Sequence, residues 1–155
     1  MTEVLPKPDH LAPKYGAQFQ DASVVAAYHH RPHYPAPIFD LLTGLIADEP
    51  RVVLDIGTGP GAIARELAAR VERVDAVDPS RGMIEQGRAL PGGDRPNLVW
   101  IEGYAEDAPL NPPYALITAG QSLHWMEWAV VMPRFRDLLT PNGVLAIAGN
   151  GAQPN

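Results

Sequence analysis

Apolar positions along the chain follow two spacings, and the two alternate. Short continuous apolar runs, typical of strands buried on both faces, occur five times. They predict strands at Arg51–Ile56, Arg73–Asp78, Asn97–Gly103, Tyr114–Gly120 and Val144–Gly149. Between these runs, apolar residues recur at the spacing of one face of a helix. Strands that alternate with helices predict an α/β fold, with a parallel sheet and right-handed crossovers.

Helical spacing is clearest just before the first predicted strand. The range Ala36–Ala47 is expected to be a helix whose buried face carries Ile38, Leu41, Leu42, Leu45 and Ile46. A shorter helix, Ala22–His29, is expected before it. Towards the end of the chain, Pro133 must begin or kink a helix, and the segment Thr140–Gly143 predicts a turn.

The first predicted strand runs directly into a glycine loop, in the stretch VVLDIGTGPGAIARELAAR. Gly57, Gly59 and Gly61 allow a backbone that other residues rarely adopt, and they let it approach a ligand closely. In parallel α/β sheets, ligands bind beyond the carboxyl ends of the strands, where the strand order reverses. The loop after Ile56 is therefore predicted to bind a ligand.

Two kinds of phosphate-binding loop resemble this one. The P-loop needs a lysine and a serine or threonine after its last glycine, and Ala62 and Ile63 occupy those places. A dinucleotide loop fits better, because Gly57, Gly59 and Ala62 have its permissive spacing and Asp78 lies where a ribose contact is expected. However, Asp55 would place a carboxylate at the mouth of a pyrophosphate site, which is electrostatically unfavourable.

S-adenosylmethionine is a third ligand that fits the loop, and it carries no phosphate. Its methionine end bears an ammonium group and its sulfur a positive charge, so Asp55 can hold the ammonium directly or by bracing the loop. Asp78 can accept hydrogen bonds from the ribose hydroxyls. Met83 can lie against the adenine or belong to the core. Glu106 or Asp107 can meet the adenine amino group.

Four motifs now appear in order along the chain: VLDIGTGPG, VDAVDPSRGM, GYAEDAPL and GQSLHW. Together they resemble the small class I S-adenosylmethionine-dependent methyltransferases, and the RPHYP and HW segments are similar to the subgroup of trans-aconitate-type enzymes. The resemblance covers roughly Phe19–Gly149. It implies a Rossmann-like three-layer αβα sandwich that binds S-adenosylmethionine as methyl donor. The residues it places at the donor are Asp55, Gly57, Thr58, Gly59, Asp78, Met83, Ala105, Glu106 and Gln121.

The acceptor side is expected after the fourth predicted strand. There His124 can take a proton from the acceptor, or it can form a packed structural pair with Trp125. The resemblance places the segment around Arg31 as a lid, where the guanidinium could hold a substrate carboxylate or simply lie at the surface. No metal is expected, because neither a carboxylate nor a cysteine is spaced to join the histidines of YHHRPHY.

Composition limits the partners and the compartment. The 155 residues are expected to form a flexible segment over 1–18 and one donor-binding domain over 19–155. A net charge of −6 argues against sequence-independent binding to nucleic acid. There is no cysteine, no signal peptide and no apolar run of membrane-spanning length, so a cytoplasmic protein that acts on a small molecule, away from membranes, is expected.

The end of the chain raises an alternative function. In the related family two further strands follow the fifth, whereas this chain reads AGNGAQPN directly after it. A truncated donor-binding module without turnover is therefore the competing hypothesis, and a nicotinamide-dinucleotide-binding protein is another. With the last two strands absent, Val144–Ala148 would form an apolar sheet edge, through which the chain is expected to self-associate.

Overall fold

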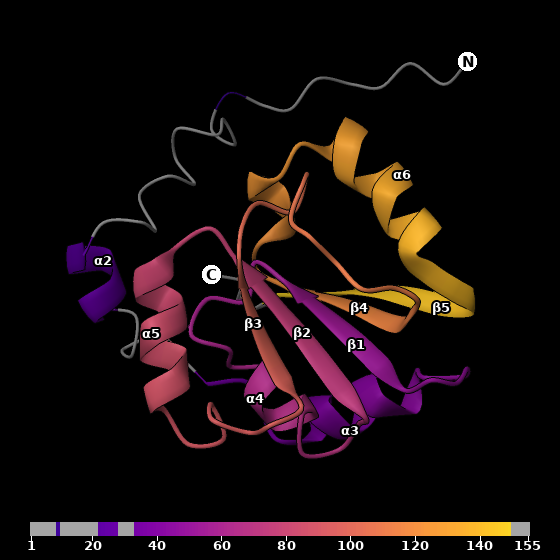
Figure 1. The fold of residues 1–155 in the computed structure, drawn as a ribbon, viewed down its shortest axis with the longest axis horizontal. Coiled ribbons are helices and arrows are strands. Elements are labelled where there is room, and N and C mark those ends of the chain that lie inside the picture. Colours follow the sequence, from indigo (N-terminus) through magenta and orange to yellow (C-terminus); the bar gives the residue numbers. More distant parts are fainter. Residues whose placement is uncertain (1–8, 10–21, 28–32, 150–155) are drawn as a thin grey trace, which may run out of the picture.

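A five-stranded parallel sheet lies at the centre of the protein (Figure 1). The computed structural model describes residues 9, 22–27 and 33–149. The strand order is β3-β2-β1-β4-β5, and each neighbouring pair is parallel. The strands are β1 (Val52–Ile56), β2 (Arg73–Asp78), β3 (Leu98–Glu102), β4 (Tyr114–Gly120) and β5 (Leu139–Ala148). The predicted α/β fold with five strands is thus confirmed.

Helices connect the strands and cover both faces of the sheet. They are α2 (Ala22–Ala27), α3 (Pro37–Gly44), α4 (Ala64–Leu67), α5 (Arg81–Ala89) and α6 (Trp128–Leu138), with a 3₁₀ turn at Leu123–Trp125. The side chains of α3 and α4 pack in one hydrophobic cluster with Val53, Val74 and Leu116 of the sheet. On the opposite face, Val131 and Phe135 of α6 pack in a second cluster. Figure 1 shows the resulting three layers.

The order of the strands places one loop at the switch point of the sheet. From the central strand β1 the chain proceeds outward to β2 and β3, and then returns to the other side of β1 to form β4 and β5. Neighbouring crossovers therefore diverge where β1 and β4 end, and this divergence opens the crevice in which α/β proteins bind ligands. The glycine loop 57–61 follows β1 at this point.

The predicted buried face of α3 is partly wrong. Leu42 is buried, but Leu41 is 66% exposed and Leu45, which follows the end of the helix, is 41% exposed. Phe39 is the second buried side chain of this helix. Because residues in a helix are about 100° apart, a stripe centred on Phe39 and Leu42 turns Leu41 towards solvent.

The sequence predicts a turn at segment 140–143, but this segment does not form a separate turn. It lies within β5, where Tyr114 pairs with Leu139 but Leu116 pairs with Val144. Between these two pairs, one residue of β4 therefore lies opposite four residues of β5, and the extra residues bulge from the ladder. Asp48 holds this bulge, since its Oδ2 accepts the Asn142 backbone N–H at 2.7 Å. Hydrogen bonds from the side chain and backbone of Asn142 also lower the pKa of Asp48.

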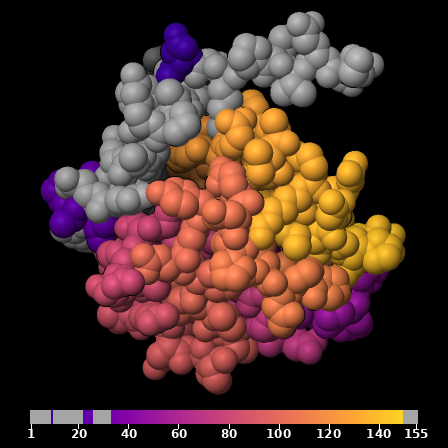
Figure 2. All heavy atoms as spheres, turned by 45° about the horizontal axis from the view of Figure 1, so that its top comes forward, coloured from indigo at the N-terminus to yellow at the C-terminus, as the bar shows by residue number. Residues whose placement is uncertain are grey.

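Strand β5 forms one edge of the sheet and lies at the molecular surface (Figure 2). Ile147 is 63% exposed on this strand, whereas Val144 packs against the core beside α3 and α4.

Pro133 lies inside α6 rather than at its start. Among the described residues, no helix has the length and apolar character needed to cross a bilayer.

Neighbouring leucines on α3 provide a matched test of this packing. Leu42→Ala should lower the free energy of unfolding by about 2–5 kcal/mol, because it leaves a cavity beneath the helix. Leu41→Ala should change it by no more than about 0.5 kcal/mol, because that side chain already contacts water. Urea unfolding of the two variants measures both values. Equal losses would show that α3 is docked in a different orientation.

Candidate functional site

The glycine loop has a backbone that requires glycine. Gly57, Gly59 and Gly61 have φ values of +64°, +58° and +78°, all in the left-handed region. Side chains with a Cβ are strained there. Gly57 also has no room for a side chain, because a Cβ would lie 2.4 Å from the Cβ of Ser122. The loop is thus bent sharply over the end of β1 and leaves its peptide groups close to whatever binds above it.

Asp78 ties the loop to the next strand. Its carboxylate ends β2 and is buried. One oxygen, Oδ2, accepts the backbone N–H of Gly59 at 2.8 Å, and the other, Oδ1, accepts the N–H of Ser80 at 2.8 Å. Ser80 in turn caps α5, because its Oγ accepts the N–H of Met83 at 3.3 Å. One side chain therefore positions both the loop and the start of α5.

Asp55 braces the same loop from below. Its Oδ2 accepts the Thr58 hydroxyl at 2.6 Å and its Oδ1 accepts the Thr118 hydroxyl at 2.7 Å. The carboxylate is thereby held between the loop and the neighbouring strand β4. Of the two roles considered for Asp55, these contacts favour bracing of the loop over a direct contact with a ligand.

Burial of the two carboxylates changes their acidity. The pKa of Asp55 is raised to about 6. Desolvation is the largest cause, the hydroxyls of Thr58 and Thr118 oppose it in part, and the nearby charge of Asp78 adds to it. Burial likewise raises the pKa of Asp78, although the N–H groups of Ser80 and Gly59 oppose this. Two acidic groups that are costly to ionise at the same end of the sheet favour a ligand that brings positive charge.

The segment after β4 completes the crevice. Gln121 has a φ of +53°, which is unusual for a residue other than glycine, and its N–H donates to the Ala148 carbonyl of β5 at 2.8 Å. Ser122 donates its hydroxyl to the Ile56 carbonyl at 2.8 Å and lies against Gly57. Strained backbone beside a ligand loop is typical of a functional site.

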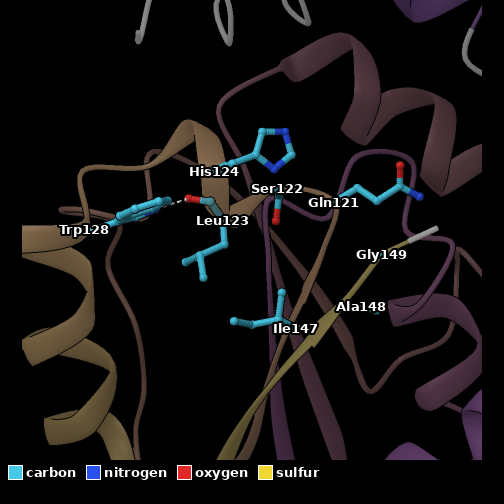
Figure 3. A pocket seen from close by; sticks show the side chains of 8 residues that line it. All are labelled: Gln121, Ser122, Leu123, His124, Trp128, Ile147, Ala148 and Gly149. Atoms are coloured by element: carbon cyan, nitrogen blue, oxygen red, sulfur yellow. Dashed lines mark hydrogen bonds between the residues drawn. The ribbon is translucent and has the colours of Figure 1, made fainter. Parts of the chain in front are cut away.

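A pocket of about 440 Å³ opens beside this segment (Figure 3). Its walls come from Gln121, Ser122, Leu123, His124, Trp128, Ile147, Ala148 and Gly149. In Figure 3, Ser122 lies between the His124 ring and Ile147, and Trp128 closes one side by donating its Nε1–H to the Leu123 carbonyl at 2.7 Å. Because Ser122 touches Gly57, the pocket adjoins the glycine loop.

His124 lies at this pocket and also packs on its neighbour. The centroids of the His124 and Trp125 rings are 4.5 Å apart, with the ring planes tilted by 53°. Both hypotheses from the sequence, a proton acceptor and a packed pair, therefore agree with the geometry.

Arg31, His29 and His30 lie outside the described residues. Tyr34 is the second described residue after this segment. It lies close to the end of β4, since a Cβ on Gly120 would lie 2.7 Å from its hydroxyl.

The loop after β3 is held mainly by α6. Arg134 donates to the carbonyls of Ala105 at 2.6 Å and Ala108 at 2.5 Å. Glu106 accepts the backbone N–H of Glu127, at the start of α6, at 2.8 Å. Within the described residues, no group of three or more histidine, aspartate or glutamate side chains could hold a metal ion.

Of the predicted donor residues, Asp55, Gly57, Thr58, Gly59 and Asp78 lie together at the glycine loop, where Asp55 accepts a hydrogen bond from Thr58 and Asp78 accepts one from Gly59. Met83 is buried in α5, next to the Ser80 cap. Sequence reasoning missed Thr118 and Ser122. Thr118 could have been noticed as the one threonine in the apolar run YALITAG, but its bond to Asp55 on β1 depends on the strand order.

Comparison with known proteins gives a consistent result. Residues 53–143 match the family model described as a methyltransferase domain. The chain is 37% identical over 131 residues to an uncharacterized methyltransferase of Mycobacterium tuberculosis, an alignment that covers 83% of this chain and 51% of that protein. It is 34% identical over 116 residues to trans-aconitate 2-methyltransferase of Methylobacterium radiotolerans, covering 72% of this chain and 42% of that one.

A solved structure shares the fold. The structure of a putative type II methyltransferase from Anaeromyxobacter dehalogenans superposes with a TM-score of 0.67 and 32% identity, over 80% of this chain and 52% of that one. The chain therefore spans about half the length of the curated relatives that it matches.

The raised pKa of Asp55 predicts a pH dependence of stability. The folded protein holds this proton up to a pH of about 6, whereas the unfolded chain loses it near 3.8. The group therefore stabilises the fold most below the unfolded pKa, and this contribution is lost as the pH rises through 6. Between pH 4 and 7 the wild-type protein should lose up to about 3 kcal/mol of its free energy of unfolding through this group. Asp55→Asn should not show this loss, and urea unfolding measures both proteins. Identical pH profiles for the two proteins would contradict the assignment.

Proposed function

Because this chain belongs to the class I S-adenosylmethionine-dependent methyltransferases, we propose that it transfers a methyl group from S-adenosylmethionine to a small molecule. One observation carries the proposal. Buried Asp55 and Asp78 hold a loop whose three glycines have positive φ, at the switch point of a parallel sheet. Such a loop accepts close approach of a ligand, and its carboxylates favour the cationic methionine end of the donor over a pyrophosphate.

The donor is proposed to lie across the ends of β1 and β2. Each oxygen of Asp78 accepts one N–H group and retains a lone pair, so the carboxylate can also accept the two ribose hydroxyls. Gly57, Thr58 and Gly59 would offer backbone to the donor, and Gln121 would meet its methionine end. Met83, Ala105 and Glu106 are proposed to line the adenine side.

The chemistry requires alignment more than activation. When bound, the donor supplies a methyl group on a positively charged sulfur. An acceptor lone pair forms the new bond to the methyl carbon while the sulfur–carbon bond breaks and its electrons neutralise the sulfonium. The protein's task is to hold the two reactants in line and to exclude water.

The acceptor is proposed to bind in the pocket beside Ser122 and His124. An acceptor that must lose a proton could pass it to His124, whereas a carboxylate acceptor needs no base and would be held by Arg31. A donor-binding module without turnover remains the second candidate, and donor binding without methyl transfer would favour it. We further propose that the protein is cytoplasmic and has no nucleic-acid partner. We also propose that it self-associates through the edge strand β5.

Donor binding is the first test of this function. Asp78→Ala should weaken binding of S-adenosylhomocysteine by about 1–3 kcal/mol, because the ribose hydroxyls and Gly59 lose a charged acceptor. Glu102→Gln, at the end of the adjacent strand, is the matched control and should bind normally. Calorimetry measures both values. Unchanged affinity in Asp78→Ala would remove the assignment, and tight binding of NAD would favour a dinucleotide site instead.

The acceptor side predicts a separation of effects. His124→Gln should lower kcat only if the acceptor loses a proton, and the rate should then depend on pH near neutrality. Arg31→Gln should raise KM for a carboxylate substrate and leave donor affinity unchanged. Steady-state assays with radiolabelled donor measure these parameters. A fully active His124→Gln variant with a flat pH profile would make His124 a structural residue.

The exposed edge predicts self-association. Ile147→Lys should shift sedimentation towards the monomer, because a charge on the exposed side of β5 opposes pairing between chains. Val144→Lys is not equivalent, since Val144 packs against the core and its substitution would destabilise the fold. Wild-type protein that remains a monomer at all concentrations would contradict the proposal.

A further inference from the structure

Two glycines far apart in the sequence leave room for one tryptophan. Trp100 lies on β3, half-buried on the face covered by α3 and α4. A Cβ on Gly61 would lie 2.6 Å from the Cη2 atom of its indole, and a Cβ on Gly87 would lie 2.3 Å from the same atom. The ring therefore fills the space between the end of the glycine loop and α5.

Gly87 is explained by two close neighbours, the Trp100 ring and the backbone of the glycine loop. Glycine within a helix costs about 1 kcal/mol relative to alanine, and Gly87, unlike Gly61, does not have a positive φ. It is required because a side chain would meet the Trp100 ring and the Pro60 carbonyl, the latter at 2.7 Å. The glycine lowers the helix propensity of α5, but it lets the glycine loop and Trp100 come close to the helix.

The indole is itself held in place. Its Nε1–H donates to the Gly93 carbonyl at 2.9 Å, which anchors the ring to the loop between α5 and β3. Arg65 secures the same part of the glycine loop, since its Nε–H donates to the Pro60 carbonyl at 3.0 Å. Asp78 therefore holds the loop at Gly59, and Trp100 supports it at Gly61, two residues further along.

We propose that Trp100 is a positioning residue for the donor, because its indole fixes the Pro60–Gly61 part of the loop and thereby the backbone that the donor contacts. The inference rests on the proposed function, and it adds a residue that lies behind the loop rather than at the ligand. Without the ring, Gly61 loses its contact with the indole, and the loop must be ordered again when the donor binds.

The test compares two cavities made in the same hydrophobic cluster. Trp100→Leu removes the support under Gly61, whereas Leu98→Ala opens a cavity on the same strand away from the loop. Both should lower the melting temperature. Only Trp100→Leu should weaken S-adenosylhomocysteine binding, by about tenfold, which corresponds to ordering roughly one further residue. Trp100→Phe, which retains a ring, should restore part of the affinity.

A second readout needs no ligand. The Gly61 N–H donates to the Thr58 carbonyl at 3.0 Å, and its hydrogen exchange reports opening of the loop. At temperatures that give equal global stability, Trp100→Leu should exchange this proton faster than Leu98→Ala does. Gly87→Ala should act in the same direction, whereas Gly82→Ala, with only ordinary contacts to Val25, should not.

The outcomes separate this proposal from the function on which it rests. Equal affinities and equal Gly61 exchange in Trp100→Leu and Leu98→Ala would overturn the role of Trp100 while leaving donor binding intact. Failure of the wild-type protein to bind S-adenosylhomocysteine would contradict the proposed function. In that case the comparison of Gly61 hydrogen exchange would still show whether Trp100 holds the loop in place.

Discussion

The hydrogen bond from the Gly59 N–H to the Asp78 carboxylate is the interaction on which the site depends. It joins the loop after β1 to the end of β2, and these two strands are neighbours in the sheet. Asp55 adds a second attachment through Thr58, and Thr118 extends it to β4. Three adjacent strands thus hold a loop whose glycine conformations would otherwise be open to many alternatives.

This arrangement has an electrostatic cost that a ligand can offset. Two carboxylates are buried at one end of the sheet, and each has a raised pKa because water is excluded from it. The described part of the loop 57–61 contains no basic side chain to balance them. The ammonium and sulfonium groups of the proposed methyl donor would supply the missing positive charge, whereas a pyrophosphate would add to the repulsion.

Much of the fold was predictable, because apolar runs and glycine spacing are local features. The positions of β2 and β4 and the sharp glycine loop after β1 followed from them. Periodicity did not show that Leu41 faces solvent, because a stripe of apolar residues does not reveal how the helix is docked. Thr118, Ser122 and Trp100 were not identified, since their partners lie on other strands and helices and become neighbours only through the strand order.

The most direct test of the account is a nitrogen-15 NMR titration of the protein with S-adenosylhomocysteine. The account predicts saturable shifts of the Gly57, Gly59 and Gly61 amides together with that of Gln121, because the ligand would lie between the loop and the segment after β4. Amides at the opposite end of the sheet should not move. Shifts confined to other parts of the chain, or none at saturating concentration, would contradict the assignment of this loop as the donor site.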